Sequence, residues 1–269
     1  MSTQPTQSHA CCTVPPATVA AGAYQPRGAF STVAGMKTYH TGPPAATVGL
    51  LVVYDIFGFA PQTLQGADIL ATGDADKPRQ VFMPDFFDGE PADPTWYPPD
   101  TDGKRAQLQA FFGAQAAPAK TLARIPGVLR ALEAAHGVGS WGIVGFCWGG
   151  KMANLCAGQT EAAMPFRCAA SCHPAMVEAA DAAALRVPFA LLASGDEARE
   201  EVAAWEKRAA GGPACLVRWW PEARHGFMAA RADLEDEAVR RDYAAGYGVL
   251  LEWFREHLDV SRAPLSGTL

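Results

Sequence analysis

The stretch GFCWGGK at residues 145–151 decides the fold of this chain. It follows an apolar run at 141–146, which predicts a buried strand, and it leads into a predicted helix at 148–157. Glycines on both sides of Cys147 allow strand and helix to approach closely through a strained turn. Such a turn lifts the thiol off the sheet and over the helix N-terminus, whose dipole favours a thiolate. The pattern G-x-nucleophile-x-G between a strand and a helix is the nucleophile elbow of α/β-hydrolases.

Strand-like and helix-like stretches alternate on both sides of this elbow. We expect strands at 47–54, 80–84, 141–146, 167–171, 187–193 and 214–220, and helices at 61–73, 104–135 (interrupted near Pro118 and Pro126), 148–157 and 233–258. Because such alternation requires crossover connections, it predicts an α/β fold with a mostly parallel central sheet and helices on both faces. Residues 29–269 are expected to form this single domain, and the polar, Pro-rich residues 1–28 a flexible N-terminal arm.

Composition narrows the function classes. The 269 residues are 49% hydrophobic and 19% charged, with a formal net charge of −6 and no basic tract. We therefore expect no nucleic-acid or membrane partner, and a small molecule as the substrate of a monomer or homodimer. The start of the chain lacks the features of a signal peptide, and seven cysteines suit no secreted disulfide scaffold. These features predict a cytoplasmic protein with mostly free thiols.

Two further polar residues follow predicted strands in the order that a hydrolase triad requires. Asp196 comes after the strand at 187–193, and His225 after the strand at 214–220. In α/β-hydrolases the chain order is nucleophile, then acid, then histidine. Each residue alone has an ordinary explanation as a helix cap or a loop residue. Together with Cys147 they predict a catalytic triad.

The residues at 145–151, 194–196 (SGD) and 225–227 (HGF) resemble the dienelactone hydrolase family, as do YDIFG at 54–58 and PDFF at 84–87. The resemblance runs from about residue 28 to the C-terminus, and CCTVPP at 11–16 is similar to the fungal branch of the family. It implies an α/β-hydrolase fold and hydrolysis of a lactone or activated ester through a cysteine acyl-enzyme. It implies neither metal nor cofactor.

The resemblance also implies roles for individual residues. Cys147 would be the nucleophile, His225 the general base and Asp196 the residue that orients His225. The oxyanion would lie between the backbone N–H groups of Ile56 and Trp148. Asp55 stands where bacterial members have a glutamate that holds the resting thiol proton.

The candidate substrate pocket departs from the bacterial pattern. Six residues are expected near it: Phe57, Phe59, Trp96, Tyr97, Phe227 and Arg231. Bacterial members bind the substrate carboxylate with two arginines that this chain lacks, and Arg231 is the nearest cation. We expect Arg231 to form a surface ion pair, which predicts an apolar pocket and neutral lactones or short aryl esters as substrates.

Two other function classes remain open from the sequence. The chain could be a catalytically silent α/β-hydrolase-fold protein that binds a ligand or a partner, and a pocket closed over Cys147 would favour this. It could also be a thiol redox sensor that pairs Cys147 with Cys172 or with Cys11 and Cys12. A metal site at Cys168, Cys172 and His173 is disfavoured, because their spacing matches no common zinc motif.

Overall fold

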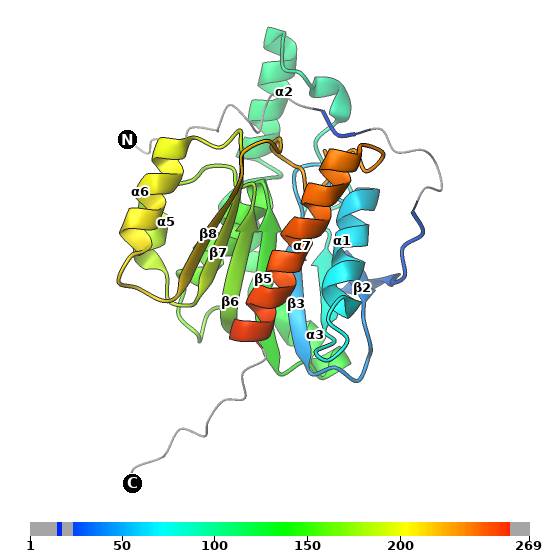
Figure 1. Ribbon diagram of the computed structural model, residues 1–269. Helices are drawn as coiled ribbons and strands as arrows, with labels where there is room; N and C mark the ends of the chain where they lie inside the picture. Colours follow the sequence, from blue (N-terminus) through cyan, green and yellow to red (C-terminus); the bar gives the residue numbers. More distant parts are fainter. Residues whose placement is uncertain (1–14, 18–23, 259–269) are drawn as a thin grey trace.

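Eight strands form one sheet in the order β1-β2-β4-β3-β5-β6-β7-β8 in the computed structural model, which describes residues 15–17 and 24–258 (Figure 1). The strands are β1 (Ala29–Val33), β2 (Met36–Thr41), β3 (Val48–Val53), β4 (Gln80–Pro84), β5 (Ser140–Phe146), β6 (Phe166–Cys172), β7 (Phe189–Ser194) and β8 (Cys215–Trp220). The pairs β1–β2 and β2–β4 are antiparallel, and all other pairs are parallel. The expected mostly parallel sheet of an α/β-hydrolase fold is confirmed.

Helices cover the sheet. They are α1 (Pro61–Thr72), the 3-10 turn η2 (Pro94–Trp96), α2 (Asp102–Gly113), α3 (Pro118–His136), α4 (Trp148–Ala157), α5 (Ala179–Ala184), α6 (Arg199–Ala209) and α7 (Glu237–His257). In Figure 1, α1 and α7 lie side by side in front of the sheet, and α3 lies behind it. No helix in residues 24–258 is long and apolar enough to cross a membrane.

Three elements differ from the sequence-based expectation. The hairpin of β1 and β2 was not expected; it turns at Ala34 and Gly35, which both have positive φ. Pro126 lies inside α3 and does not interrupt it, because buried apolar side chains on the same helix pack against the core. Helix α7 begins at Glu237 because the Asp236 carboxylate accepts hydrogen bonds from two backbone N–H groups of its first turn.

The carboxyl ends of the six neighbouring parallel strands, β4 to β8 in the sheet order, meet at one edge of the sheet. Register pairs Val53 with Gly145, Phe146 with Cys172 and Ser194 with Trp220. The loops that follow β3, β5, β6, β7 and β8 therefore begin side by side. Helix α2 and its connections stand above this edge, at the top of Figure 1.

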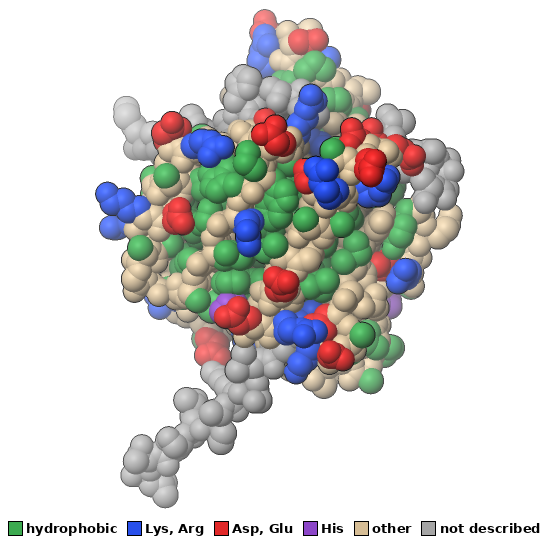
Figure 2. All heavy atoms as spheres, in the orientation of Figure 1, with side chains coloured by type: hydrophobic (Ala, Val, Ile, Leu, Met, Phe, Trp, Pro, Cys, Tyr) green, Lys and Arg blue, Asp and Glu red, His purple; other side chains and the backbone are tan. Residues whose placement is uncertain are grey.

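The β8 edge of the sheet keeps apolar side chains at the surface. Strand β8 is the edge strand, and its residues Leu216, Val217, Trp219 and Trp220 are only partly buried. Figure 2 shows apolar side chains gathered between α6 and α7, over the region of β7 and β8. The interior, by contrast, is closely filled, and every residue of β3 from Gly49 to Val53 is buried.

Candidate active site

The turn that carries Cys147 is strained, as the elbow pattern predicts. Cys147 has φ 53° and ψ −113°, a conformation that non-glycine residues rarely adopt. A Cβ atom at Gly145 would lie 1.8 Å from the carbonyl oxygen of Gly149, and one at Gly149 would lie 2.0 Å from that of Val53. Gly145 is therefore required for β5 to approach α4, and Gly149 for α4 to approach the end of β3. The thiol stands between the end of β5 and the first residue of α4.

His225 brings its imidazole to this thiol from the loop after β8. Its Nδ1 atom lies 2.7 Å from Oε1 of Glu197, and the side chains of both residues are almost fully buried. Burial alone lowers the pKa of His225, but the negative charges and hydrogen bonds of Cys147 and Glu197 outweigh it and raise the pKa to about 10. The arrangement therefore favours an imidazolium ring between a thiolate and a carboxylate.

The carboxylate on the His225 ring is that of Glu197, which corrects the expectation that Asp196 orients the imidazole. Asp196 is exposed, and its Oδ2 atom accepts a hydrogen bond from the backbone N–H of His225 at 2.8 Å. Glu197 turns back toward β7, where its carboxylate accepts hydrogen bonds from the backbone N–H and, at 3.0 Å, the hydroxyl of Ser194. Two acidic residues follow the strand directly, and the direction of the turn decides which of them reaches the ring.

Asp55 lies in the turn after β3, fully buried. Its Oδ1 atom accepts a hydrogen bond from the N–H of Phe57 at 2.9 Å, and Oδ2 accepts one from Ala230 at 3.2 Å. Burial raises the pKa of Asp55 to about 6; the charge of Arg231 lowers it, and the charge of Cys147 raises it. Asp55 is therefore close enough to both side chains to interact with them electrostatically, and it titrates near neutral pH.

The two expected oxyanion donors come from different elements next to the thiol. Trp148 is the first residue of α4, so its N–H belongs to the first turn, where helices have no internal acceptor. Its ring Nε1 donates to the carbonyl of Ala116 at 2.8 Å, which ties the α2–α3 connection to the elbow. Ile56 is fully buried in the turn next to Asp55. Their role as an oxyanion hole stays a prediction.

The six pocket candidates fall into two groups. Phe227 and Arg231 line a cavity of about 480 Å³ that also includes His225. The Arg231 guanidinium lies 4.8 Å from the ring centre of Phe57 and 5.6 Å from that of Tyr97. Phe59 instead packs on Tyr54 and Phe30, and Trp96 on Phe111.

The expected surface ion pair of Arg231 is wrong. Arg231 is 8% exposed, and it stacks on aromatic rings beside Asp55 rather than in solvent. The three-residue stretch 15–17 lies nearby, since the N–H of Ala17 donates to the carbonyl of Ala230 at 2.9 Å. The cavity next to His225 is therefore lined by buried Arg231 and by Phe227, and its other lining residues are mostly charged: Glu222, Arg224, Asp233, Asp236, Arg241 and Asp242.

The site is closed in this conformation. Cys147 and His225 both have 0% exposed surface. The cavity of about 480 Å³ reaches His225 but is not lined by Cys147. A substrate would therefore have to move part of this wall to reach the thiol.

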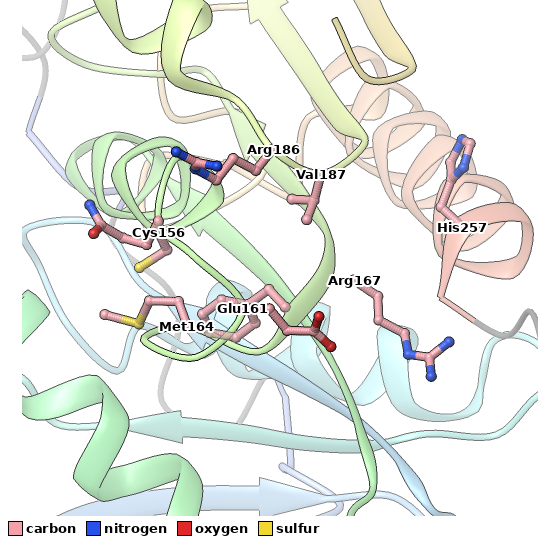
Figure 3. A pocket seen from close by; sticks show the side chains of 9 residues that line it. Cys156, Glu161, Met164, Arg167, Arg186, Val187 and His257 are labelled. Atoms are coloured by element: carbon pink, nitrogen blue, oxygen red, sulfur yellow. The ribbon is translucent and has the colours of Figure 1, made fainter. Parts of the chain in front are cut away.

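The other described cysteines have different surroundings. Burial raises the pKa of Cys156 and of Cys172, and Cys215 is exposed. Cys156 lines a second cavity of about 340 Å³ near the amino ends of β6 and β7, away from the site (Figure 3). In Figure 3, charged side chains from several segments surround this cavity, among them Glu161, Arg167, Arg186 and His257. Cys11 and Cys12 lie outside the described residues.

No group of three or more metal-ligating side chains occurs among the residues that the structure describes. The sequence analysis missed two residues of the site. Glu197 stood next to the expected acid, and its presence directly after Asp196 was the available signal. His173 was considered only as a metal ligand, yet its ring lies 5.2 Å from that of His225.

Comparison with known proteins identifies the family of this chain. Residues 36–258 match the model of the dienelactone hydrolase family. An uncharacterised AIM2 family protein of Schizosaccharomyces pombe is 33% identical over 225 residues, which cover 82% of this chain and 87% of that protein. A carboxymethylenebutenolidase homologue of Mus musculus is 34% identical over 122 residues, 44% of this chain and 45% of that one. The crystal structure of dienelactone hydrolase from Anabaena variabilis superposes with a TM-score of 0.61 at 15% identity and covers 87% of this chain and 98% of that one, a likeness of fold.

Proposed function

Because this chain belongs to the dienelactone hydrolase family, we propose that it hydrolyses a lactone or an activated carboxylic ester through a thioester on Cys147. One observation carries the proposal: the His225 ring is held between the Cys147 thiol and the Glu197 carboxylate. A thiolate next to an imidazolium is a ready nucleophile, and the carboxylate keeps the ring in one orientation. The triad is therefore Cys147, His225 and Glu197, in the chain order Cys-Glu-His.

The first half of the reaction forms the thioester. The thiolate sulfur attacks the ester carbonyl carbon, and the N–H groups of Ile56 and Trp148 stabilise the oxyanion. The carbon–oxygen bond to the leaving group then breaks, and the imidazolium of His225 gives its proton to the leaving alkoxide. In a lactone the leaving group stays attached to the acyl chain, so the ring opens.

Asp55 has an auxiliary role in this proposal. Its pKa, raised to about 6 by burial, suits a carboxylate that accepts the thiol proton near neutral pH. Aspartate is one methylene shorter than the glutamate of bacterial members. Its two backbone hydrogen bonds, from Phe57 and Ala230, fix the carboxylate in place.

The substrate class follows from the nucleophile, because thiolates displace alkoxides and phenolates more readily than amines. The cavity beside His225 combines Phe227 with charged side chains, among them Arg224, Arg231 and Asp233. We therefore propose small lactones and aryl esters as substrates rather than peptides. We further propose a cytoplasmic enzyme without a metal or cofactor, acting as a monomer or homodimer without nucleic-acid or membrane partners.

The test is to trap the acyl-enzyme. Purified protein is mixed with p-nitrophenyl acetate and with a panel of small lactones, quenched in acid, digested and analysed by mass spectrometry. We expect an acetyl group on Cys147, and we expect Cys147→Ser to lose at least a thousandfold in kcat/KM on every substrate. Turnover without any acyl group on Cys147, or full activity of Cys147→Ser, would contradict the proposal.

A second candidate function is supported by the closed site. Because Cys147 and His225 are fully buried, the protein could bind a ligand or partner at this edge of the sheet without catalysis. Absence of turnover across the panel, with Cys147 unlabelled by iodoacetamide in the folded protein, would favour this candidate. The described residues do not support the redox-sensor alternative, because burial raises the pKa of Cys172 and so disfavours its reactive thiolate.

A further inference from the structure

His173 is a buried histidine without a role in the proposed reaction. It comes directly after β6 and has 0% exposed surface. Neither of its ring nitrogens has a hydrogen-bond partner among the residues that the structure describes. A buried polar group without a hydrogen-bond partner is destabilising, so this imidazole requires an explanation.

The backbone holds His173 at a cost as well. Its φ is 37°, in the left-handed region that is unfavourable for most side chains. The surrounding hydrogen bonds impose this conformation: His173 N–H donates to Leu192 at 2.6 Å, while the carbonyl of Cys172 and the N–H of Ala175 both bond to the backbone of Cys147, at 3.0 and 3.1 Å. Strain of this kind concentrates at functional sites. The loop that holds His173 is therefore built onto the nucleophile elbow.

The ring points to the reacting groups. Its centre lies 5.2 Å from that of His225, with the two planes at 72°, and 5.8 Å from that of Phe227. Both neighbours line the cavity of about 480 Å³. Of the six neighbouring parallel strands, β3, β5, β7 and β8 each lead into a residue of the proposed machinery, β4 leads into Asp85, and β6 leads into His173.

His173 stays neutral throughout a reaction cycle. Burial lowers its pKa well below the usual range, and the positive charges of His225 and Arg231 lower it further. A neutral imidazole offers one N–H donor and one lone-pair acceptor. The His173 ring is in contact with the rings of Phe146, Phe227 and His225, and its two polar atoms fit a small molecule that both donates and accepts hydrogen bonds.

We propose that His173 is a positioning residue that holds the hydrolytic water beside His225 during thioester cleavage. The inference rests on the proposed function. The two rings meet edge to face with their centres 5.2 Å apart, so a nitrogen at the rim of each ring can bond to one water that lies beside the contact. Such a water is held by His173 and His225, two of the polar partners that a buried water needs.

The step balances without another reactant. Nε2 of neutral His225 takes a proton from the water while its oxygen bonds to the thioester carbonyl carbon. The carbon–sulfur bond then breaks, and the electron pair returns to Cys147 as thiolate. The product is a carboxylic acid, which loses its proton to solvent, and the thiolate–imidazolium pair is restored.

The test separates acylation from deacylation. His173→Phe keeps an aromatic ring of similar shape and removes both nitrogens. With p-nitrophenyl acetate we expect it to lower kcat at least tenfold and KM in proportion, so that kcat/KM, which reports acylation, changes less than threefold. Acetylated Cys147 should accumulate in quenched samples, and added hydroxylamine, which attacks the thioester without a positioned water, should restore turnover.

Two further variants exclude a merely structural role. His173→Asn keeps a donor and an acceptor and tolerates positive φ, so it should retain more of kcat than His173→Phe, although it is smaller. Phe146→Leu disturbs the packing on the same ring, and it should change acylation and deacylation equally. If His173→Phe does not fold, His173→Leu replaces it.

The outcomes are distinct. An unchanged deacylation rate in His173→Phe or His173→Leu, or an equal fall of acylation and deacylation in them, overturns the role of His173 and leaves the proposed function intact. Absence of acetylated Cys147 in every protein, wild type included, overturns the proposed function itself.

Discussion

Cys147 precedes the first residue of α4 and Cys156 lies in its last turn, so one helix carries a fully buried thiol at each end. Burial alone makes a thiol inert, and it raises the pKa of Cys156 well above the usual range. At the other end, the helix N-terminus and the His225 ring favour the thiolate of Cys147. The comparison shows that the surroundings of the sulfur, and not its exposure, separate a nucleophile from a core residue.

The rate of alkylation should show the largest difference between the two thiols, Cys147 and Cys156. Because only the thiolate reacts, limiting iodoacetamide at pH 7.5 should modify Cys147 at least a hundredfold faster than Cys156. Esterase activity should fall in proportion to the labelling of Cys147. Mass spectrometry of the digest gives both rates, and exposed Cys215 serves as the reference for an ordinary accessible thiol. Full activity after stoichiometric labelling of Cys147 would end the proposed mechanism.

We expect the next largest loss of activity from replacing Glu197, whose carboxylate contacts the His225 ring. Glu197→Gln should lower kcat about a thousandfold, because the neutral amide no longer stabilises the imidazolium. Asp196→Asn should lower kcat less than tenfold, because an amide oxygen still accepts the backbone N–H of His225. Each variant is assayed on the same aryl ester, with thermal unfolding as the control for folding. A larger loss in Asp196→Asn than in Glu197→Gln would restore Asp196 as the residue that orients the imidazole.

How much of this site could be read from the sequence depends on distance along the chain. The elbow was predicted because its chemistry and its glycines lie within seven residues, and six of the eight strands were predicted from their short apolar runs. The choice between Asp196 and Glu197 could not be predicted, because it depends on how the turn after β7 bends back onto Ser194. The burial of Arg231 was also missed, since it arises from Phe57 and Tyr97, which lie more than a hundred residues away.

The pKa of His225 tests the electrostatic part of the comparison. It should be raised to about 10 in the wild type and fall in Cys147→Ala, because the thiolate that opposes the effect of burial is gone. Since the folded pKa exceeds the ordinary value of 6.5, the contribution of His225 to the free energy of unfolding is complete below pH 6.5 and is lost as the pH rises through about 10. NMR titration of the imidazole protons measures the pKa in both proteins. An unchanged pKa in Cys147→Ala would show that the thiol does not act on the ring.

We expect the smallest effect from replacing Arg231, the buried cation whose charge acts on Asp55. Arg231 lowers the pKa of Asp55, so Arg231→Met should raise that pKa above its present value of about 6. If Asp55 must be ionised to accept the thiol proton, the acidic limb of kcat/KM moves to higher pH in the variant. For a neutral aryl ester we therefore expect a change of less than threefold at pH 8, where Asp55 is ionised in both proteins, and a larger loss at pH 6. The matched control is Arg186→Met beside Cys156, which should leave the whole pH profile unchanged. A hundredfold loss confined to lactones that bear a carboxylate would instead identify Arg231 as a substrate-binding cation, and the pocket would then select anionic rather than neutral substrates.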